Sequence, residues 1–217
     1  IIKIPYANIS LCKDHFIEIG DSMKFVFDPH DGSSIGLPKP DVSADVVFVT
    51  HEHFDHNAVH VVKGLPKVIN RPGSGDIGKI HYDAILEFHD SKGGKERGEV
   101  KIYKVKMENL SFTHVGDLGR IPDETAINFM KNTDFLFIPV GSVYTINAKQ
   151  AKEIVDKVNP GIVVPMHFAV KGSKLGLEPV ENFTSLFPGN IVKRVGKQVE
   201  FKQDNLPKTM EVWVFNI

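Results

Sequence analysis

A strongly apolar segment that ends in a cluster of metal-type ligands dominates the sequence. Residues 46–49 are all apolar, and Thr50-His51-Glu52-His53-Phe54-Asp55-His56 follows at once. An all-apolar run of this length predicts a strand that is buried on both faces. Imidazole nitrogens and carboxylate oxygens are ligands that Zn²⁺, Fe²⁺ and Mn²⁺ accept. The segment therefore predicts several metal ligands on one loop, and the alternative is a solvated loop that is rich in histidine by coincidence.

The same pattern recurs elsewhere in the chain. Asp28 follows the apolar residues 25–27, His114 follows a strand-like run from residue 110, and His167 follows residues 162–166. Open α/β sheets place their sites where neighbouring strands end. We therefore expect these side chains to converge with the His51–His56 loop at one edge of a sheet.

Periodicity and turn residues predict the remaining elements. A hairpin is expected from residues 16–19 and 24–27 around a turn at residues 20–22, and short helices are expected at residues 57–62 and 123–131. A longer helix is expected at residues 147–158, because Asn147 can cap it and the apolar residues share one face. Further strands are expected at residues 84–88, 100–106, 110–115, 135–140, 162–165, 199–202 and 212–215.

Size and composition favour a single globular domain over residues 1–217. The chain is 41% hydrophobic and 24% charged, with 26 basic and 27 acidic side chains. That balance provides no basic field for a nucleic-acid backbone, so we expect a small-molecule substrate and no nucleic acid.

Cys12 is the single cysteine, which excludes an internal disulfide and predicts a buried, inert thiol. No segment is long and apolar enough for a membrane span, so we expect no membrane partner and a cytoplasmic location; the sequence does not predict an oligomeric state.

Together, the motifs resemble those of the metallo-β-lactamase superfamily. The segments that carry the resemblance are Thr50 to His56, His114-Val115-Gly116-Asp117 and Pro165-Met166-His167, with Asp28-Pro29 opening the series. The resemblance implies an α/β fold, the αββα four-layer sandwich of two mixed β-sheets. It also implies a site for two divalent metal ions, with zinc expected first and manganese or iron as alternatives.

Each motif position then receives a role by resemblance. His51, His53 and His114 would hold the first metal, and Asp55, His56 and His167 the second. Asp117 would bridge the two metals, and Asp28 would orient the ligands from outside. The resemblance implies that hydroxide held by both metals attacks the substrate, with Asp55 placed to orient it or to receive its proton.

Departures within the superfamily narrow the expected substrate. A di-iron electron-transfer relative would carry glutamate in place of His53, and a true β-lactamase lacks the carboxylate that Asp117 supplies. Nuclease members carry a long insert for which this chain has no room.

The chain more closely resembles small Zn-dependent hydrolases related to the ascorbate-6-phosphate lactonase group, through Phe88-His89-Asp90, Arg97-Gly98 and Pro139-Val140-Gly141. It departs from them at residues 6–10 and at Arg120, where they often carry histidine. We expect a small, anionic ester, lactone, thioester or phosphoester.

Several other side chains have two interpretations. His89 and Tyr144 are candidates for the substrate pocket, but a surface histidine and a packing aromatic explain them as well. Arg71 and Arg97 could bind an anion or be ordinary surface charges. The remaining histidines, His15, His30, His60 and His81, are interpreted as structural. Two alternative functions stay open, a metal-holding binding module without turnover and a mononuclear iron thiol dioxygenase.

Overall fold

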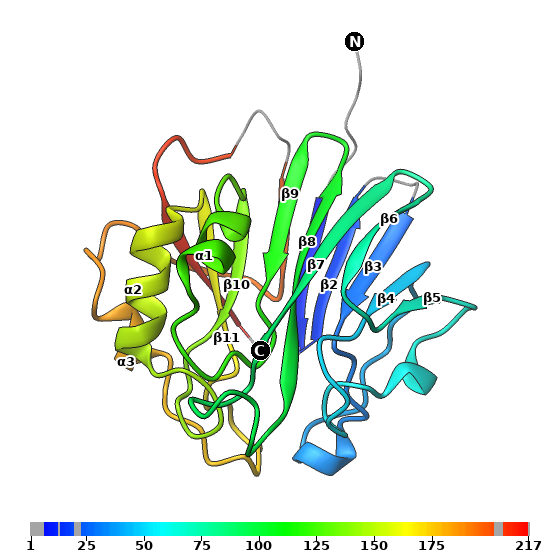
Figure 1. The fold of residues 1–217 in the computed structure, drawn as a ribbon, viewed down its shortest axis with the longest axis horizontal. Coiled ribbons are helices and arrows are strands. Elements are labelled where there is room, and N and C mark those ends of the chain that lie inside the picture. The colour runs from blue at the N-terminus through cyan, green and yellow to red at the C-terminus, as the bar shows by residue number, and fades with distance from the viewer. Residues whose placement is uncertain (1–6, 13, 20–22, 202–205, 217) are drawn as a thin grey trace.

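The computed structural model describes residues 7–12, 14–19, 23–201 and 206–216, with the side chains of residues 7–19, 198, 200 and 201 outside the description. The predicted turn at residues 20–22 and the surroundings of the Cys12 and His15 side chains therefore lie outside the described residues. Within them, the structure is a sandwich of two sheets (Figure 1).

The first sheet combines antiparallel and parallel pairing. Its described strands follow the order β13-β1-β2-β3-β4-β5. β1, β2 and β3 pair antiparallel, whereas β3, β4 and β5 pair parallel. The predicted hairpin is thus present as β2 and β3. The bounds are β1 Ala7–Cys12, β2 Asp14–Ile19, β3 Met23–Phe27, β4 Val46–Phe48, β5 Lys67–Ile69 and β13 Gln198–Phe201.

The second sheet is also mixed and follows the order β12-β14-β11-β10-β9-β8-β7-β6 among the described strands. β6 to β9 pair antiparallel, and β9, β10, β11 and β14 pair parallel. The bounds are β6 Gly73–Ile77, β7 Ile80–Phe88, β8 Glu99–Met107, β9 Leu110–His114, β10 Phe135–Pro139, β11 Ile162–Met166, β12 Val192–Val195 and β14 Glu211–Phe215.

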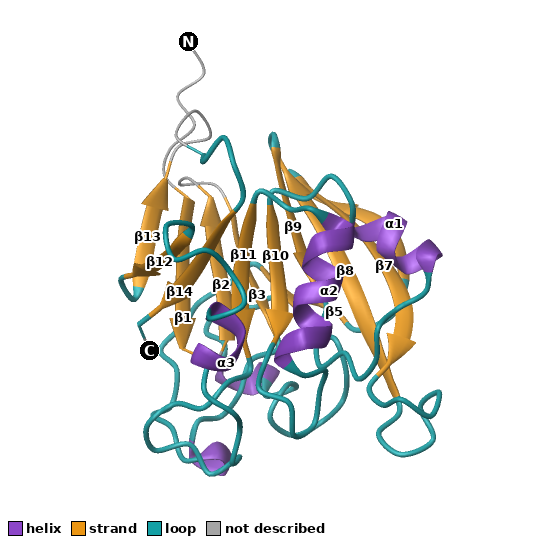
Figure 2. Ribbon diagram, turned by 90° about the vertical axis from the view of Figure 1, so that its left-hand side faces the viewer, coloured by secondary structure: helices purple, strands orange, loops and turns teal. Residues whose placement is uncertain are grey.

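The helices lie over the outer face of the second sheet. α1 (Glu124–Met130), α2 (Ala148–Val158) and α3 (Glu181–Thr184) cover the side of β10 and β11 that faces away from the first sheet (Figures 1 and 2). Over the first sheet, the 3-10 helix η2 (Val59–Val61) packs with residues of β3 and β4, and a further 3-10 helix, η1, spans Ser33–Ile35. Helix was predicted over residues 57–62. A single 3-10 turn forms there instead, because three β-branched valines in a short segment give little helical stability.

The core explains why β3 and β4 read as apolar runs. Phe25 and Phe27 of β3 point into the main core between the sheets, whereas Val26 packs into a second cluster on the outer face. The ring of Phe25 meets Phe112 of β9 edge-on at 5.7 Å between centroids, which joins the two sheets. Because one core is shared by both sheets, we propose that the chain is a single domain.

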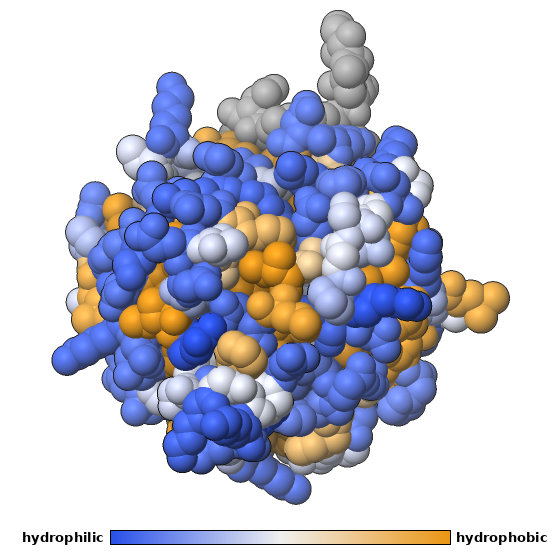
Figure 3. Space-filling model, in the orientation of Figure 1, coloured by the Kyte–Doolittle hydropathy of each residue, from blue (hydrophilic) through white to orange (hydrophobic). Residues whose placement is uncertain are grey.

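Most of the face turned to the viewer in Figure 3 is hydrophilic, with small separate hydrophobic patches. Among the described residues, no helix has the length and apolar character needed to cross a membrane. The predicted α/β sandwich of two mixed β-sheets is confirmed.

Candidate metal centre

The predicted site residues gather where strands of both sheets end. β3 leads into Asp28, β4 into the loop from Thr50 to His56, and β11 into His167. β7 and β9 of the second sheet lead into His89 and Asp117. The two parallel sets, β3 with β4 and β9 with β10 and β11, account for the convergence, because parallel strands end on the same edge.

Asp28 organises the start of the metal-type loop. Its carboxylate accepts a hydrogen bond from the Thr50 backbone N–H at 2.7 Å and another from the Thr50 hydroxyl at 2.6 Å. The same carboxylate lies 3.2 Å from Nδ1 of His56. Asp28 adopts a positive φ of 48°, in the left-handed region that non-glycine residues seldom occupy. The predicted orienting role of Asp28 thus has a geometric basis, since it contacts residues on both sides of His51.

Thr50 sets the tautomer of His51. The Thr50 hydroxyl has a single proton, which it donates to Asp28, and its oxygen lies 3.0 Å from Nδ1 of His51. We infer that Nδ1 of His51 is the donor in this contact, which leaves a lone pair on Nε2. That Nε2 is buried and has no hydrogen-bond partner among the described residues. Burial and the neighbouring His56 lower the pKa of His51 to about 2, so the ring is neutral, as a metal ligand must be.

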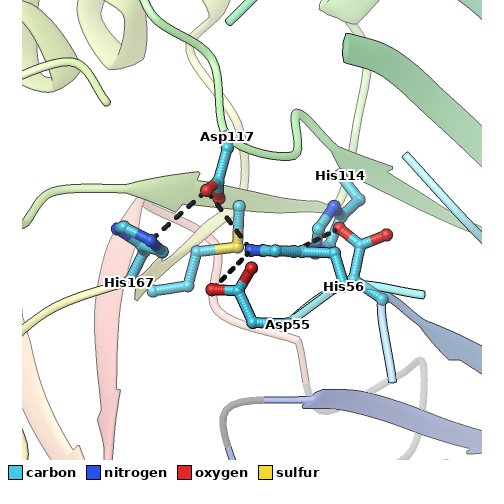
Figure 4. Close-up of a pocket in the computed structure, with 7 residues that line it drawn as sticks. Asp55, His56, His114, Asp117 and His167 are labelled. Atoms are coloured by element: carbon cyan, nitrogen blue, oxygen red, sulfur yellow. Dashed lines mark hydrogen bonds and ion pairs between the residues drawn. The ribbon is translucent and has the colours of Figure 1, made fainter. Parts of the chain in front are cut away.

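Asp117 lies among three histidines. Its Oδ2 is 3.3 Å from Nε2 of His56, 3.3 Å from Nε2 of His167 and 3.6 Å from Nε2 of His89. Burial would raise the pKa of Asp117, but His167 and His56 hold the pKa of this carboxyl well below its usual range. Figure 4 shows Asp117 and Asp55 approaching His56 from different sides, while His167 approaches Asp117. The arrangement gives an ionised, buried carboxylate at the middle of the site.

The carboxylates around His56 stabilise positive charge in the site. Burial would lower the pKa of His56, but Asp117 and Asp28 outweigh it and raise the pKa well above 6.5. Asp55 adds a third carboxylate, with its Oδ2 3.7 Å from Nε2 of His56. A proton on His56 thus occupies a position between carboxylates where a divalent cation would also be stabilised.

Metal-type donor atoms come together in three overlapping groups among the described residues. One contains His51, His53 and His89, another Asp28, His51 and His56, and a third His56, Asp117 and His167. Within each group, one donor atom from every residue lies within 4.8 Å of the others. The first group matters most for the sequence predictions, because it contains His89 where His114 was expected.

His114 belongs to none of these groups among the described residues. Its Nδ1 accepts a hydrogen bond from the Gly116 backbone N–H at 3.1 Å, and its ring stacks on Phe27 at 4.6 Å between centroids. It still lines a small pocket with Asp28, Asp55 and His56 (Figure 4). His89 lies beside the metal-type loop because the long strand β7 ends there, and its ring lies 4.9 Å from those of both His51 and His53. The sequence did mark His89 as a candidate pocket residue, since it too follows a strand directly. An ordinary surface histidine explained the same pattern equally well.

Two glycines let the backbone of the site pack closely. A Cβ added to Gly119 would lie 2.3 Å from the backbone carbonyl carbon of His89, and one added to Gly141 would lie 2.0 Å from the carbonyl oxygen of His167. His167 itself has a positive φ of 51°. The turns that carry His89 and His167 therefore approach Gly119 and Gly141 so closely that no residue with a Cβ fits at these two positions.

A larger cavity adjoins the donor groups. It has a volume of about 300 Å³, and its lining residues come from several loops: His53, Phe54, Asp55, His89, Arg97, Asp117, Tyr144, His167 and Leu175. The interpretation of His89 and Tyr144 as pocket residues agrees with this lining. The cavity gives a small substrate access to the carboxylates and imidazoles.

The donor set fits a metal ion on the evidence of its unpaired atoms. Nε2 of His51 and Nδ1 of His89 are buried, and no described residue forms a hydrogen bond with either atom. Such burial costs free energy unless another group satisfies the two atoms. Burial lowers the pKa of His89, so this ring is neutral as well. Neutral imidazoles beside ionised carboxylates are a donor set that Zn²⁺, Mn²⁺ and Fe²⁺ all accept. Fold and donors together define a metalloprotein of the α/β sandwich class.

Comparison with known proteins identifies the family. Residues 15–167 match the model of the β-lactamase superfamily domain. A metal-dependent hydrolase of Bacillus licheniformis is 28% identical over 93% of this chain and 100% of its own length. A solved structure from Thermotoga maritima, described as a Zn-dependent hydrolase of the metallo-β-lactamase superfamily, is 32% identical and has a TM-score of 0.80 over 96% of this chain and 98% of that one. A metal-dependent hydrolase of Parabacteroides distasonis, 20% identical with a TM-score of 0.60 over 76% of this chain and 83% of that one, shares the fold.

The chain therefore belongs to the metallo-β-lactamase superfamily. It is a metal-dependent hydrolase of that superfamily.

Proposed function

We propose that this chain holds two divalent cations and hydrolyses a small ester, lactone, thioester or phosphoester. His51, His53 and His89 would hold the first cation, and Asp55, His56 and His167 the second. Asp117 would contact both. The observation that carries the proposal is the convergence of Asp117 with three histidines at 3.3 to 3.6 Å.

This assignment replaces His114 with His89. His114 instead supports Asp117, because it ends β9 just before the loop of Asp117 and its Nδ1 accepts the Gly116 N–H between them. A change at His89 should therefore remove metal, whereas a change at His114 should weaken the packing beneath the site.

The residues around the cations divide the remaining tasks. Two divalent cations, when bound, supply Lewis acidity and a nucleophile from water near neutral pH. Asp55 lines the cavity, and its carboxylate can take the proton of the attacking water. Asp28 fixes the ring of His56 through Nδ1, so that Nε2 faces Asp117. Such orienting contacts commonly matter for metal affinity.

Chelation and site mutation test the proposal together. Protein purified without added metal should contain two metal ions per chain, by elemental analysis. A chelator should abolish turnover on a panel of esters, lactones, thioesters and phosphodiesters, and Zn²⁺ or Mn²⁺ should restore it. His53→Ala should remove turnover, whereas His60→Ala, an exposed histidine on η2, should not. Turnover that survives both a chelator and His53→Ala would exclude a metal-dependent mechanism.

A second candidate rests on the histidine group alone. His51, His53 and His89 form a cluster of three imidazoles that suits a single Fe²⁺ ion. One iron per chain, together with consumption of oxygen on a small thiol, would favour a mononuclear dioxygenase. Stoichiometric metal without turnover of any substrate would favour a binding module. A cytoplasmic location and the absence of nucleic-acid partners stay predictions.

A further inference from the structure

The cavity beside the donor groups has a second wall that contains no candidate metal donor. His53, Asp55, His89, Asp117 and His167 form the donor wall. The second wall is made by Phe54, Arg97, Tyr144 and Leu175. A substrate whose reacting bond faces the donor wall must place its other end against these four side chains.

Arg97 is the one guanidinium or ammonium group among the described residues that line this cavity. Its Cζ lies 4.9 Å from the centroid of the Tyr144 ring, a cation–π distance. Tyr144 in turn meets His167 of the donor wall at 6.5 Å between centroids, with the two rings close to perpendicular. Tyr144 is therefore next to both Arg97 and the donor wall.

The guanidinium of Arg97 has no carboxylate or hydrogen-bond partner in the described part of the chain. The face of the guanidinium stacks on the Tyr144 ring. Its N–H groups lie in the plane of the guanidinium and can therefore still donate hydrogen bonds to an anion. Arg120 shows the contrast, because it stacks on Phe88 and also pairs with Glu87 at 3.0 Å. Arg97 is held in position like Arg120 but lacks the internal anion that neutralises it.

The loop that carries Arg97 is fixed to the donor wall. The carboxylate of Asp90 accepts backbone N–H groups from four residues of the loop, Lys92, Gly94, Glu96 and Arg97, at 2.7 to 3.0 Å. The backbone N–H of His89 donates to the carbonyl of Gly98 at 3.0 Å. Arg97 thus sits on an ordered loop that begins and ends beside His89, which suits a group that must be positioned before a substrate arrives.

We propose that Arg97, stacked on Tyr144, binds an oxyanion at the end of the substrate remote from the bond that is cleaved. The oxyanion is a carboxylate or a phosphate, either of which can accept two parallel N–H groups from a guanidinium. Phe54 and Leu175 contact the carbon skeleton between this anion and the reacting bond. The cavity volume of about 300 Å³ is at the lower end of the range for small-molecule pockets, so the substrate is a small molecule.

The cleavage of the substrate in this inference rests on the proposed function, whereas the binding of its oxyanion by Arg97 can be measured without any cleavage. Metal-loaded protein is titrated by calorimetry with glutarate and with its monoamide, which differ by one carboxylate and are otherwise equal in size. Wild type should bind glutarate at least about 10-fold more tightly, the range expected for a charge-assisted hydrogen bond. Arg97→Gln should abolish this difference and Arg97→Lys should retain part of it. 3-Phosphonopropionate in a parallel titration tells whether phosphate is preferred to carboxylate.

Kinetics supply the second readout. S-acetylthioglycolate and S-acetylthioglycolamide form a matched thioester pair that differs in one charge. Arg97→Gln should lower kcat/KM for the charged thioester about 10- to 100-fold, mainly through KM, and leave the neutral one unchanged. Arg71→Gln, an exposed arginine away from the cavity, is the matched control. Tyr144→Phe keeps the ring and should keep the preference, whereas Tyr144→Leu should weaken it.

Each outcome decides the inference. Equal binding of glutarate and its monoamide by wild type overturns it. A loss of affinity in Arg97→Gln that is the same for charged and neutral ligands also overturns it, because the arginine would then act only on loop structure. An Arg97-dependent binding preference without any thioester, lactone or ester hydrolysis supports the inference while the proposed function fails.

Discussion

Asp28 illustrates how one side chain can serve the site without belonging to the cavity that receives the substrate. It accepts two hydrogen bonds from Thr50 and lies 3.2 Å from His56, so it affects rings on either side of the loop. Asp28→Asn is an informative change, because asparagine tolerates the positive φ at this position and keeps the size of the side chain.

We expect Asp28→Asn to lower metal affinity by about 10- to 100-fold, since the amide cannot replace the charge that orients His56. Competition with a chromophoric chelator measures the change. Asp156→Asn, an exposed carboxylate on α2, is the control and should have wild-type affinity. Equal affinities for Asp28→Asn and wild type would remove Asp28 from the metal centre.

Gly119 tests the close approach between loops. Alanine there would place Cβ 2.3 Å from the backbone nitrogen of Asp90, and backbone cannot rotate away as a side chain can. We expect Gly119→Ala to cost about 1–3 kcal/mol in the free energy of unfolding and to reduce bound metal, because His89 must shift. Gly189→Ala has nothing within 4 Å of its added methyl and should change stability little. Urea unfolding of both variants compares them, and equal stability would contradict the packing argument.

At the scale of secondary structure, α2 has a complete N-terminal cap. Asn147 accepts the Gln150 N–H at 3.0 Å, and the Gln150 side chain accepts the Asn147 N–H at 3.0 Å. We expect Asn147→Ala to lower the free energy of unfolding by about 1 kcal/mol, since the Gln150 N–H at the helix end loses its side-chain acceptor. Lys149→Ala on the exposed face is the control. Denaturant unfolding followed by circular dichroism measures both, and a neutral Asn147→Ala would show that packing alone holds the helix end.

The β6–β7 hairpin provides a pH-dependent contact far from the metal centre. His81 Nδ1 lies 2.8 Å from Asp76, and Nε2 lies 3.3 Å from Asp83. The hydrogen bond to Asp76, with the charge of Asp83, raises the pKa of His81 above 6.5. The stabilising contribution is therefore present below 6.5 and is lost as pH rises through the folded-state pKa. NMR titration of the imidazole should report the raised pKa, and Asp76→Asn should return it toward 6.5; a wild-type value at or below 6.5 would be inconsistent with the ion pair.

Helices and strands with a strong local sequence pattern could be predicted. Strands that form only through pairing with a neighbouring strand could not. The apolar runs of β4, β10 and β11 and the capped helices α1 and α2 appear close to their predicted bounds. β6 reads Gly-Ser-Gly-Asp-Ile, which has no strand periodicity, and it forms because each residue has a partner on β7. The short strand β5 likewise depends on parallel pairing with β4. Tertiary pairing, not propensity, decides such segments.

The candidate site shows the same division. The consecutive spacing from His51 to His56 could be interpreted directly, because one loop supplies these side chains. The choice between His89 and His114 could not be made, since both follow strands and only the arrangement of the second sheet decides which ring faces His51 and His53. Arg97 and Tyr144 are 47 positions apart, so no sequence pattern connects them before the loops come together.

At the scale of the whole molecule, the metal centre joins the two sheets. His51, His53 and Asp55 follow β4 of the first sheet, whereas His89, Asp117 and His167 follow strands of the second. Beyond the centre, the sheets share one hydrophobic core, in which Phe25 of the first sheet contacts Phe112 of the second. Bound cations should therefore stabilise the contact between the sheets as well as supply chemistry.

Removal of metal should lower the melting temperature for this reason. A ligand that binds only the folded state adds about 2.7 kcal/mol at a free concentration 100 times its Kd and about 4.1 kcal/mol at 1,000 times. Without metal, Nε2 of His51 and Nδ1 of His89 are buried with no hydrogen-bond partner among the described residues, and three carboxylates, those of Asp28, Asp55 and Asp117, lie close to His56. We expect chelation to lower the melting temperature of wild type by several degrees, and Zn²⁺ to restore it in proportion to the logarithm of its free concentration. His53→Ala should respond far less to either treatment, because its first cation is already lost. A wild-type melting temperature that is the same with chelator and with Zn²⁺ would mean that the cations do not link the two sheets.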